Sequence, residues 1–240
     1  MSQFKDDFFE TTASYPDKDF PKGRQSTMIK LSPSSLNLFL ECPRCFWLYL
    51  NKGIKRPSIP VATITTGLDK VIKEYCNLYR AKGILPPILE GKVLGKLMRH
   101  LPKKGWLEFS EAKINAKIGG YLDECLDLGN NFYAALDHKT RGSKPESTHR
   151  AHQFQMDVYT FLLERNRFPT KKLAYLIYYI PKSVAAKDTV EFEIIASEIK
   201  TDPGRAEKVF YDAVFALRQP IPQGNNECGF CQWMATINIK

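Results

Sequence analysis

Two C-x-x-C motifs near opposite ends of this 240-residue chain constrain its fold more than any other feature. Cys42 and Cys45 form C-P-R-C, and Cys228 and Cys231 form C-G-F-C. A two-residue spacing lets both thiolates of a pair turn toward one ion or cluster, so we interpret the four cysteines as metal ligands rather than disulfides. Such a site would join the first helix to the C-terminal tail. The alternative is four buried or idle thiols.

Composition and charge narrow the class of protein. A hydrophobic content of 43% with 12% aromatic residues is sufficient for a packed globular core. The 35 Lys and Arg residues exceed the 26 Asp and Glu residues and give a net charge of +9, which favours an anionic partner, most commonly nucleic acid. No apolar run approaches the roughly 20 residues of a membrane span, and the N-terminus lacks a signal-peptide pattern. We therefore expect a cytoplasmic protein that neither enters a membrane nor is secreted.

The periodicity of apolar residues predicts one domain preceded by an arm. Residues 1–29 are polar and aperiodic and predict a flexible N-terminal arm, and residues 30–240 predict a single domain. An order of helices and strands with mixed spacing predicts an α/β or α+β core with one mixed β-sheet flanked by helices. The expected helices cover residues 33–41, 66–81, 90–100, 147–166 and 203–218, and the expected strands cover residues 107–109, 113–117, 121–128, 132–140, 173–180 and 189–196.

The hairpin around Asn130 carries the side chains best suited to binding a cation and to acid–base chemistry. With the turn centred there, Asp123 faces Asp137 across two antiparallel strands, at a β-carbon separation of about 5 Å. Like charges at that distance destabilise a sheet unless a cation lies between them. Lys139 shares the face of Asp137, whereas His138 points to the other face. Carboxylate oxygens suit Mg²⁺ or Mn²⁺, and a neighbouring lysine can orient or deprotonate a metal-activated water, as phosphodiester hydrolysis requires. The alternative is a solvated strand face with an exposed ion pair.

The residues flanking this hairpin resemble a known family. The three segments concerned are Gly120-Tyr121-Leu122-Asp123, Asp137-His138-Lys139-Thr140 and Gln155-Met156-Asp157-Val158-Tyr159. They resemble the G-x-x-D, D-x-K-T and Q-x-x-x-Y series of RecB-type nucleases in the PD-(D/E)XK superfamily. The segments Leu31-Ser32-Pro33-Ser34-Ser35-Leu36 and Glu41-Cys42-Pro43-Arg44 likewise resemble the N-terminal part of the RecB/AddB-like branch. The resemblance extends over residues 31–231.

This resemblance implies a restriction-endonuclease-like core and assigns roles to the hairpin residues. Asp123 and Asp137 would be metal ligands, the carbonyl of His138 a further ligand, and Lys139 the catalytic lysine. Gln155 and Tyr159, four residues apart on one helix face, would line the site or contact DNA. Their alternative interpretation is ordinary helix surface.

Two features depart from the family pattern. Many relatives carry a histidine ligand in a G-x-x-x-H motif, whereas Gly67-Leu68-Asp69-Lys70-Val71 offers only Asp69, which is either a Mg²⁺ ligand or an exposed helix residue. The iron-sulfur members of the branch have one N-terminal and three C-terminal cysteines, whereas this chain has two and two. Four thiolates accept either a [4Fe-4S] cluster or Zn²⁺, and we expect the site to be structural rather than catalytic.

These observations together predict a Mg²⁺- or Mn²⁺-dependent deoxyribonuclease. We expect an exonuclease that hydrolyses single-stranded DNA, or DNA with free ends, in repair, recombination or related processing. A helicase or recombination protein is a conceivable partner in trans. The alternative is a non-catalytic nucleic-acid-binding or scaffold subunit that keeps the nuclease fold. A weaker alternative makes the four-cysteine site a redox sensor, which would need exposed thiolates of low pKa.

Overall fold

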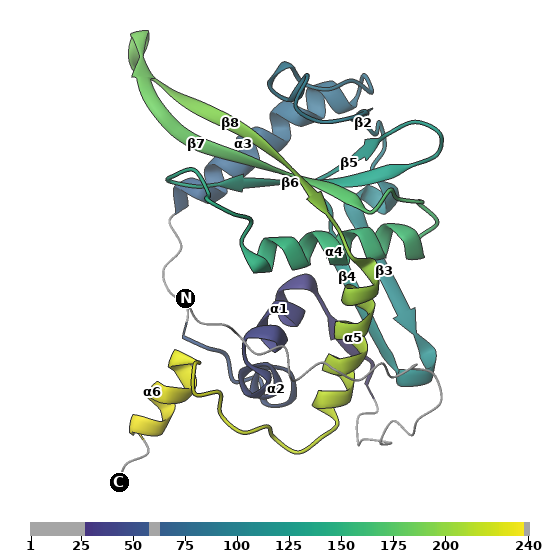
Figure 1. The fold of residues 1–240 in the computed structure, drawn as a ribbon, viewed down its shortest axis with the longest axis vertical. Coiled ribbons are helices and arrows are strands. Elements are labelled where there is room, and N and C mark those ends of the chain that lie inside the picture. The colour runs from purple at the N-terminus through teal and green to yellow at the C-terminus, as the bar shows by residue number, and fades with distance from the viewer. Residues whose placement is uncertain (1–26, 58–62, 238–240) are drawn as a thin grey trace.

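The computed structural model describes residues 27–57 and 63–237, which form a mixed α/β structure (Figure 1). The strands are β1 (Ile29–Leu31), β2 (Lys96–Leu97), β3 (Trp106–Glu111), β4 (Ala116–Tyr121), β5 (Glu124–Asp127), β6 (Tyr133–Thr140), β7 (Leu173–Ala185) and β8 (Thr189–Lys200). The α-helices are α1 (Pro33–Glu41), α2 (Pro43–Lys52), α3 (Thr63–Arg80), α4 (Arg150–Arg165), α5 (Pro203–Leu217) and α6 (Gly229–Ile237).

The strands form a five-stranded sheet and a smaller three-stranded sheet. The larger has the order β2-β5-β6-β7-β8, in which only β6 and β7 are parallel. The smaller has the order β1-β4-β3, with β1 parallel to β4. Only Leu122 and Asp123 separate β4 from β5, so the chain bends from one sheet into the other at that point. The predicted mixed sheet flanked by helices is confirmed.

Helices cover both faces of the larger sheet. One core joins α4 to β6 and β7 through side chains such as Phe161, Ala135 and Leu176. The other core joins α3 to the opposite face through side chains such as Ile72 and Leu136. Because neighbouring residues of a strand point to opposite faces, successive residues of β6 contribute to different cores. This alternation allows one strand to serve two environments.

Local signals fix the ends of the predicted helices. Ser32 and Ser35 form a reciprocal capping box at the start of α1, and Pro33 occupies the first helical turn. Asp202 caps α5 by accepting a hydrogen bond from the backbone N–H of Arg205. The helices predicted at 33–41, 66–81, 147–166 and 203–218 are therefore present, with shifts of a few residues at their ends.

The helix predicted at residues 90–100 is wrong. This segment contains turns and the short strand β2. Gly91 and Gly95 adopt positive φ angles of 69° and 80°, which interrupt a helix. At Gly95 a β carbon would lie 2.3 Å from the carbonyl oxygen of Asp127, so the turn requires glycine for its close approach to the end of β5.

Two further differences concern elements that the periodicity missed or shortened. Helix α2 has no counterpart among the elements expected from the sequence, and it begins at Pro43 because Cys42 is extended and ends α1. The predicted strands at 173–180 and 189–196 are longer in the structure, and their ends form a hairpin that projects from the body (Figure 1). Residues 1–26 of the predicted arm lie outside the described residues, and Ile29, its last residue, begins β1.

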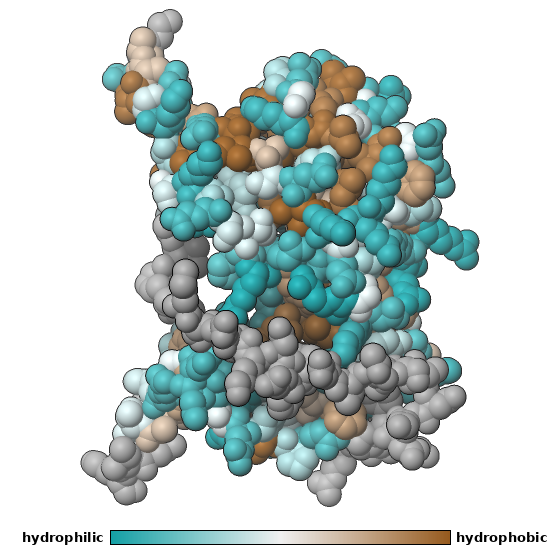
Figure 2. Space-filling model, viewed as in Figure 1, coloured by the Kyte–Doolittle hydropathy of each residue, from teal (hydrophilic) through white to brown (hydrophobic). Residues whose placement is uncertain are grey.

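The apolar pattern of α3 is only partly buried. Ile72 and Cys76 face the sheet, whereas Val71 and Leu78 are 60% and 65% exposed. Figure 2 shows apolar side chains gathered in the upper half of this face of the molecule, where α3 and the larger sheet lie. Within the described ranges, the helices are too short or too polar to cross a membrane.

Candidate active site

The hairpin of β5 and β6 has the predicted register. Glu124 pairs with Leu136 and Cys125 pairs with Ala135, as expected for a turn centred on Asn130. Asn130 adopts a positive φ of 51°, a conformation that asparagine and glycine tolerate better than other residues. The local sequence therefore sets which residues of the two strands oppose each other.

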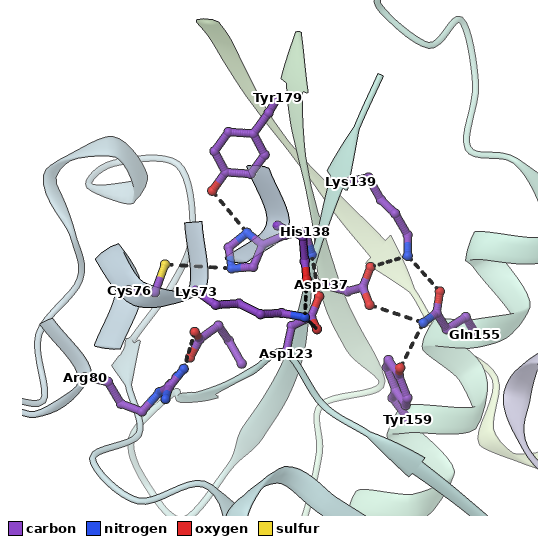
Figure 3. A network of polar contacts seen from close by, with 12 residues as sticks. Lys73, Cys76, Arg80, Asp123, Asp137, His138, Lys139, Gln155, Tyr159 and Tyr179 are labelled. Atoms are coloured by element: carbon purple, nitrogen blue, oxygen red, sulfur yellow. Dashed lines mark hydrogen bonds and ion pairs between the residues drawn. The ribbon is translucent and has the colours of Figure 1, made fainter. Parts of the chain in front are cut away.

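Asp137 is a buried carboxylate on β6 of this hairpin. Its side chain is 3% exposed, and its Oδ2 lies 2.6 Å from Lys139 Nζ (Figure 3). Apart from that ion pair, Oδ2 has no hydrogen-bond partner among the described residues. Burial raises the pKa of Asp137 to about 6, because desolvation and the nearby Asp123 outweigh the opposing effect of Lys139. The strand thus presents a buried oxygen with one cationic neighbour and capacity for another.

Asp123 lies directly before β5 and turns toward β6. Its Oδ2 accepts a hydrogen bond of 3.1 Å from the backbone N–H of His138. Its Oδ1 lies 2.9 Å from Lys73 Nζ, and the same ammonium lies 2.9 Å from Asp69 Oδ2. Burial alone would lower the pKa of Lys73, but the hydrogen bonds to the two carboxylates outweigh it and raise the pKa. Lys73 therefore links Asp69 of α3 to the hairpin.

Gln155 and Tyr159 reach the hairpin from α4. Gln155 Nε2 donates to Asp137 Oδ1 at 3.2 Å, and Gln155 Oε1 accepts from Lys139 at 3.0 Å. The same amide nitrogen lies 2.8 Å from the hydroxyl oxygen of Tyr159, whose side chain is buried. These two residues are not ordinary helix surface, because Gln155 contacts the Asp137 and Lys139 side chains from α4 and Tyr159 contacts Gln155 in turn (Figure 3).

His138 divides its contacts between the two faces of β6. Its backbone N–H contacts Asp123, whereas its ring points away from Asp137 toward Cys76 and Tyr179 (Figure 3). Burial lowers the pKa of His138 to about 4, so the imidazole is neutral near pH 7. The expected opposite orientation of His138 and Lys139 is thus observed. The involvement of the His138 carbonyl in metal binding stays a prediction.

Two carboxylates at the end of the hairpin are of the kind that a divalent cation prefers. Asp123 and Asp137 supply oxygens that suit Mg²⁺ and Mn²⁺, whereas Asp69 lies on α3 and is joined to Asp123 through Lys73, so the three carboxylates are not all within 4.8 Å of one another. The buried Oδ2 of Asp137, which has only an ammonium beside it, is the atom with the clearest need of a further cation. The residues on this face are therefore suited to metal binding.

The four cysteines of the two C-x-x-C motifs lie together, as predicted. The Sγ atoms of Cys42 and Cys231 are 3.6 Å apart, those of Cys45 and Cys228 are 3.7 Å apart, and all four lie within 4.8 Å of one another. They are free thiols rather than disulfides. Cys42 lies between α1 and α2, whereas Cys231 belongs to α6 (Figure 1). The cluster therefore joins the N-terminal helices to the C-terminal tail.

Hydrogen bonds favour a thiolate at Cys228, whereas burial raises the pKa of Cys45 to about 12. Burial raises the pKa of Cys228, but hydrogen bonds from the Cys231 backbone and the other thiols outweigh it and lower the value to about 7. Arg56 Nη2 donates to Cys228 Sγ at 3.5 Å. Because a thiolate is the form that binds metal, the surroundings of Cys228 suit a Zn²⁺ or iron-sulfur ligand.

Lys73 is a candidate site residue that the sequence interpretation missed. Its four-residue spacing from Asp69 predicts an ion pair along one helix, which is observed. The contact with Asp123 depends on how α3 packs against the sheet, and no local pattern reports that packing.

The chain matches one protein family and is similar to two solved structures. The model of the PD-(D/E)XK nuclease superfamily matches residues 84–236, a range that contains the β5–β6 hairpin and α4. The crystal structure of SSO0001 is similar, with 15% identity and a TM-score of 0.45 over 92% of this chain and 88% of that one. The phage-related exonuclease from Haemophilus somnus 129PT is similar with 12% identity and a TM-score of 0.44, over 88% of this chain and 97% of that one. No curated protein matches the sequence.

Proposed function

The chain belongs to the PD-(D/E)XK nuclease superfamily, and from this premise we propose that it is a metal-dependent deoxyribonuclease whose active centre is the β5–β6 hairpin. The observation that carries the proposal is the joint placement of Asp123, Asp137 and Lys139 at one end of that hairpin, with Gln155 holding two of them. A buried carboxylate beside a lysine is typical of a catalytic site that uses general acid–base chemistry.

Each residue has a distinct part in the proposed reaction. Asp123 and Asp137 would hold Mg²⁺ or Mn²⁺, with Asp69 as a further carboxylate donor. When bound, the cation supplies Lewis acidity toward the phosphate and lowers the pKa of the attacking water. Lys139 orients that water and offsets negative charge on the phosphodiester as the bond to the leaving oxygen breaks. The Lys139 ammonium is placed for this because Asp137 and Gln155 hold it on two sides.

Gln155 and Tyr159 act in this proposal as positioning residues. The amide of Gln155 bridges Asp137 and Lys139, and the Tyr159 hydroxyl contacts that amide in turn. Their contacts fix rotamers of the reacting groups before substrate arrives, which reduces the reorganisation needed in the transition state.

A surface suited to nucleic acid lies beside the four-cysteine cluster. A cavity of about 450 Å³ is lined by the cations of Arg44, Lys55 and Arg56 and by the rings of Phe230 and Trp233. Cationic and aromatic side chains together suit single-stranded nucleic acid, because phosphates and base faces are both satisfied. This lining and the net charge of +9 support a DNA substrate.

The finer features of the proposal concern substrate and cofactors. Exonuclease action on single strands or free ends, in repair or recombination, rests on the resemblance to RecB-type nucleases. The four cysteines would hold Zn²⁺ or a [4Fe-4S] cluster as a structural centre. A helicase or recombination partner stays a prediction from the sequence.

A non-catalytic nucleic-acid-binding subunit is the second candidate function. The observation that favours it is Lys73, whose ammonium lies between Asp69 and Asp123 and already forms an ion pair with each. In that case the carboxylates would have no use for a divalent cation.

Cleavage of DNA labelled at one end separates the two candidates. Full-length protein is incubated with single- and double-stranded DNA, with Mn²⁺ or with a chelator of divalent ions. The nuclease proposal expects cleavage only with Mn²⁺, and an exonuclease gives products that shorten progressively from one end. DNA binding without cleavage, together with failure to bind Mn²⁺ at millimolar concentration, would overturn the nuclease proposal in favour of the binding subunit.

A further inference from the structure

A second group of metal-ligating side chains lies on the face of β6 opposite Asp137. Cys76 Sγ, a Glu124 carboxylate oxygen and a His138 ring nitrogen lie within 4.8 Å of one another, a property shared in the described residues only with the four cysteines. All three residues are buried, with Cys76 and Glu124 at 0% exposure and His138 at 7%. We propose that these three side chains form a separate site for Zn²⁺ or a chemically similar divalent transition metal.

The distances require little rearrangement for metal binding. Cys76 Sγ lies 3.8 Å from His138 Nε2. Bond lengths of about 2.3 Å to sulfur and about 2.0 Å to nitrogen, in a tetrahedral geometry, separate these two ligand atoms by about 3.5 Å. The two groups therefore stand almost as far apart as a shared Zn²⁺ would hold them.

Tyr179 supplies the outer contact that metal-binding histidines commonly have. Its hydroxyl oxygen lies 3.1 Å from His138 Nδ1, on the side of the ring away from Cys76 (Figure 3). When Nδ1 carries the proton and donates it to the hydroxyl oxygen, Nε2 keeps a lone pair directed at the site. The hydrogen bond thus orients the ring with its free nitrogen toward the thiol.

Arg80 orients the carboxylate without using all of its acceptor capacity. Its Nε donates to Glu124 Oε2 at 2.9 Å, and its Nη2 donates to Glu124 Oε1. Each carboxylate oxygen has a further lone pair. A thiolate and a carboxylate neutralise a divalent cation, and the Cys76 thiol proton passes to solvent on binding. Because Arg80 already offsets the Glu124 charge, binding of a divalent cation with loss of this one proton adds one positive charge to the site.

Metal at this site would be structural. Cys76 belongs to α3, Glu124 to β5 and His138 to β6, so one ion would tie the helix to both strands of the hairpin. His138 also contacts Asp123 through its backbone N–H. The inference does not depend on nuclease activity, because it rests on donors that face away from Asp137.

Zinc content per chain tests the proposal. Full-length wild type, Cys76→Ala and Cys125→Ala are dialysed against buffered free Zn²⁺ with excess Mg²⁺, which occupies oxygen-ligand sites. Cys125 is a matched control, because it is equally buried on β5 but lies outside the ligand group. We expect Cys76→Ala to retain one equivalent of zinc fewer than wild type and Cys125→Ala to match wild type. Equal zinc content in all three proteins would overturn the proposal, whether the four-cysteine site holds zinc or iron-sulfur.

A spectroscopic measurement on the wild type decides the matter if Cys76→Ala fails to fold. The four-cysteine site is filled first, and one further equivalent of Co²⁺ is then added in the presence of Mg²⁺. A new thiolate-to-cobalt absorption with the intensity of a single sulfur ligand is expected. Failure of this absorption to appear would overturn the proposal, because the carboxylate site has no sulfur ligand.

Discussion

Gln155 Nε2 donates a hydrogen bond of 3.2 Å to Asp137 Oδ1, so a helix side chain fixes the orientation of the buried carboxylate on β6. The same side chain accepts a hydrogen bond from Lys139, and it therefore sets the separation of the two groups proposed to act on the phosphodiester. The site is assembled between one strand and one helix that are connected by the segment 141–149.

Replacing Gln155 with Ala is expected to lower the rate of DNA cleavage by roughly 10- to 100-fold, as is typical when a residue supporting a metal ligand is removed. The measurement is kcat under saturating Mn²⁺, with thermal unfolding to show that the fold is retained. Gln232→Ala, on the exposed face of α6, is the control and should leave the rate unchanged. A Gln155→Ala protein as fast as wild type would remove Gln155 from the site.

The raised pKa of Asp137, about 6, makes metal-free stability depend on pH. Because the folded protein holds this proton more tightly than the unfolded chain, the stabilisation is present at low pH and is lost as pH rises from about 4 to about 6. Asp137→Asn should remove this part of the pH dependence, which amounts to roughly 3 kcal/mol in the free energy of unfolding. Denaturant unfolding at several pH values measures it. The same protonation should weaken Mn²⁺ binding below pH 6. If the free energy of unfolding depends on pH in the same way in wild type and Asp137→Asn, the assignment of the raised pKa to Asp137 is contradicted.

Lys73 competes with a divalent cation for Asp123. Lys73→Met is therefore expected to tighten Mn²⁺ binding by roughly tenfold, because a nearby positive charge is removed. Lys70→Met is the matched control, since Lys70 lies on the same helix, is mostly exposed and pairs only weakly with Glu74 at 3.8 Å. Mn²⁺ titration followed by electron paramagnetic resonance measures both variants. Weaker binding in Lys73→Met than in Lys70→Met would show that Lys73 supports the site instead of competing in it.

The sequence specifies the hairpin and its faces more fully than it specifies the site around them. The turn at Asn130 determines the register, and strand alternation then separates Lys139 from His138. These are local effects. Contacts of Gln155 and Lys73 with the hairpin depend on how α4 and α3 pack against the sheet, so spacing along the chain indicates only that they share a helix face with other residues.

The error at residues 90–100 has a different origin. Apolar residues there recur at a spacing that is found both in helices and in irregular turns. Gly91 and Gly95, with their positive φ angles, determine that the segment forms turns. Gly95 is required by its approach to Asp127, which belongs to another strand and is therefore invisible to a local pattern. The cysteine cluster was predictable, in contrast, because two C-x-x-C motifs indicate one shared binding site even when they lie far apart in the sequence.

Loss of the metal or cluster at the four cysteines should weaken the attachment of the N-terminal helices to the C-terminal tail. Cys231→Ala is expected to lose its bound metal or cluster and to lower the unfolding temperature by several degrees or more, because metal binding is coupled to folding. Visible absorption of the purified wild type distinguishes a coloured iron-sulfur cluster from colourless Zn²⁺, and elemental analysis counts the ions. A Cys231→Ala protein that is as stable and as metal-rich as wild type would show that the cluster binds nothing.

The most direct test of the proposed active centre compares cleavage of end-labelled single-stranded DNA by wild type, Asp137→Asn and Lys139→Met with Mn²⁺. Asp188→Asn, at an exposed position with a positive φ that asparagine also tolerates, is the control for loss of one carboxylate. We expect the control to match wild type, and both active-centre variants to lose activity by at least about 100-fold while remaining folded and bound to DNA. Cleavage by Asp137→Asn at the wild-type rate would contradict the assignment of this hairpin as the catalytic centre.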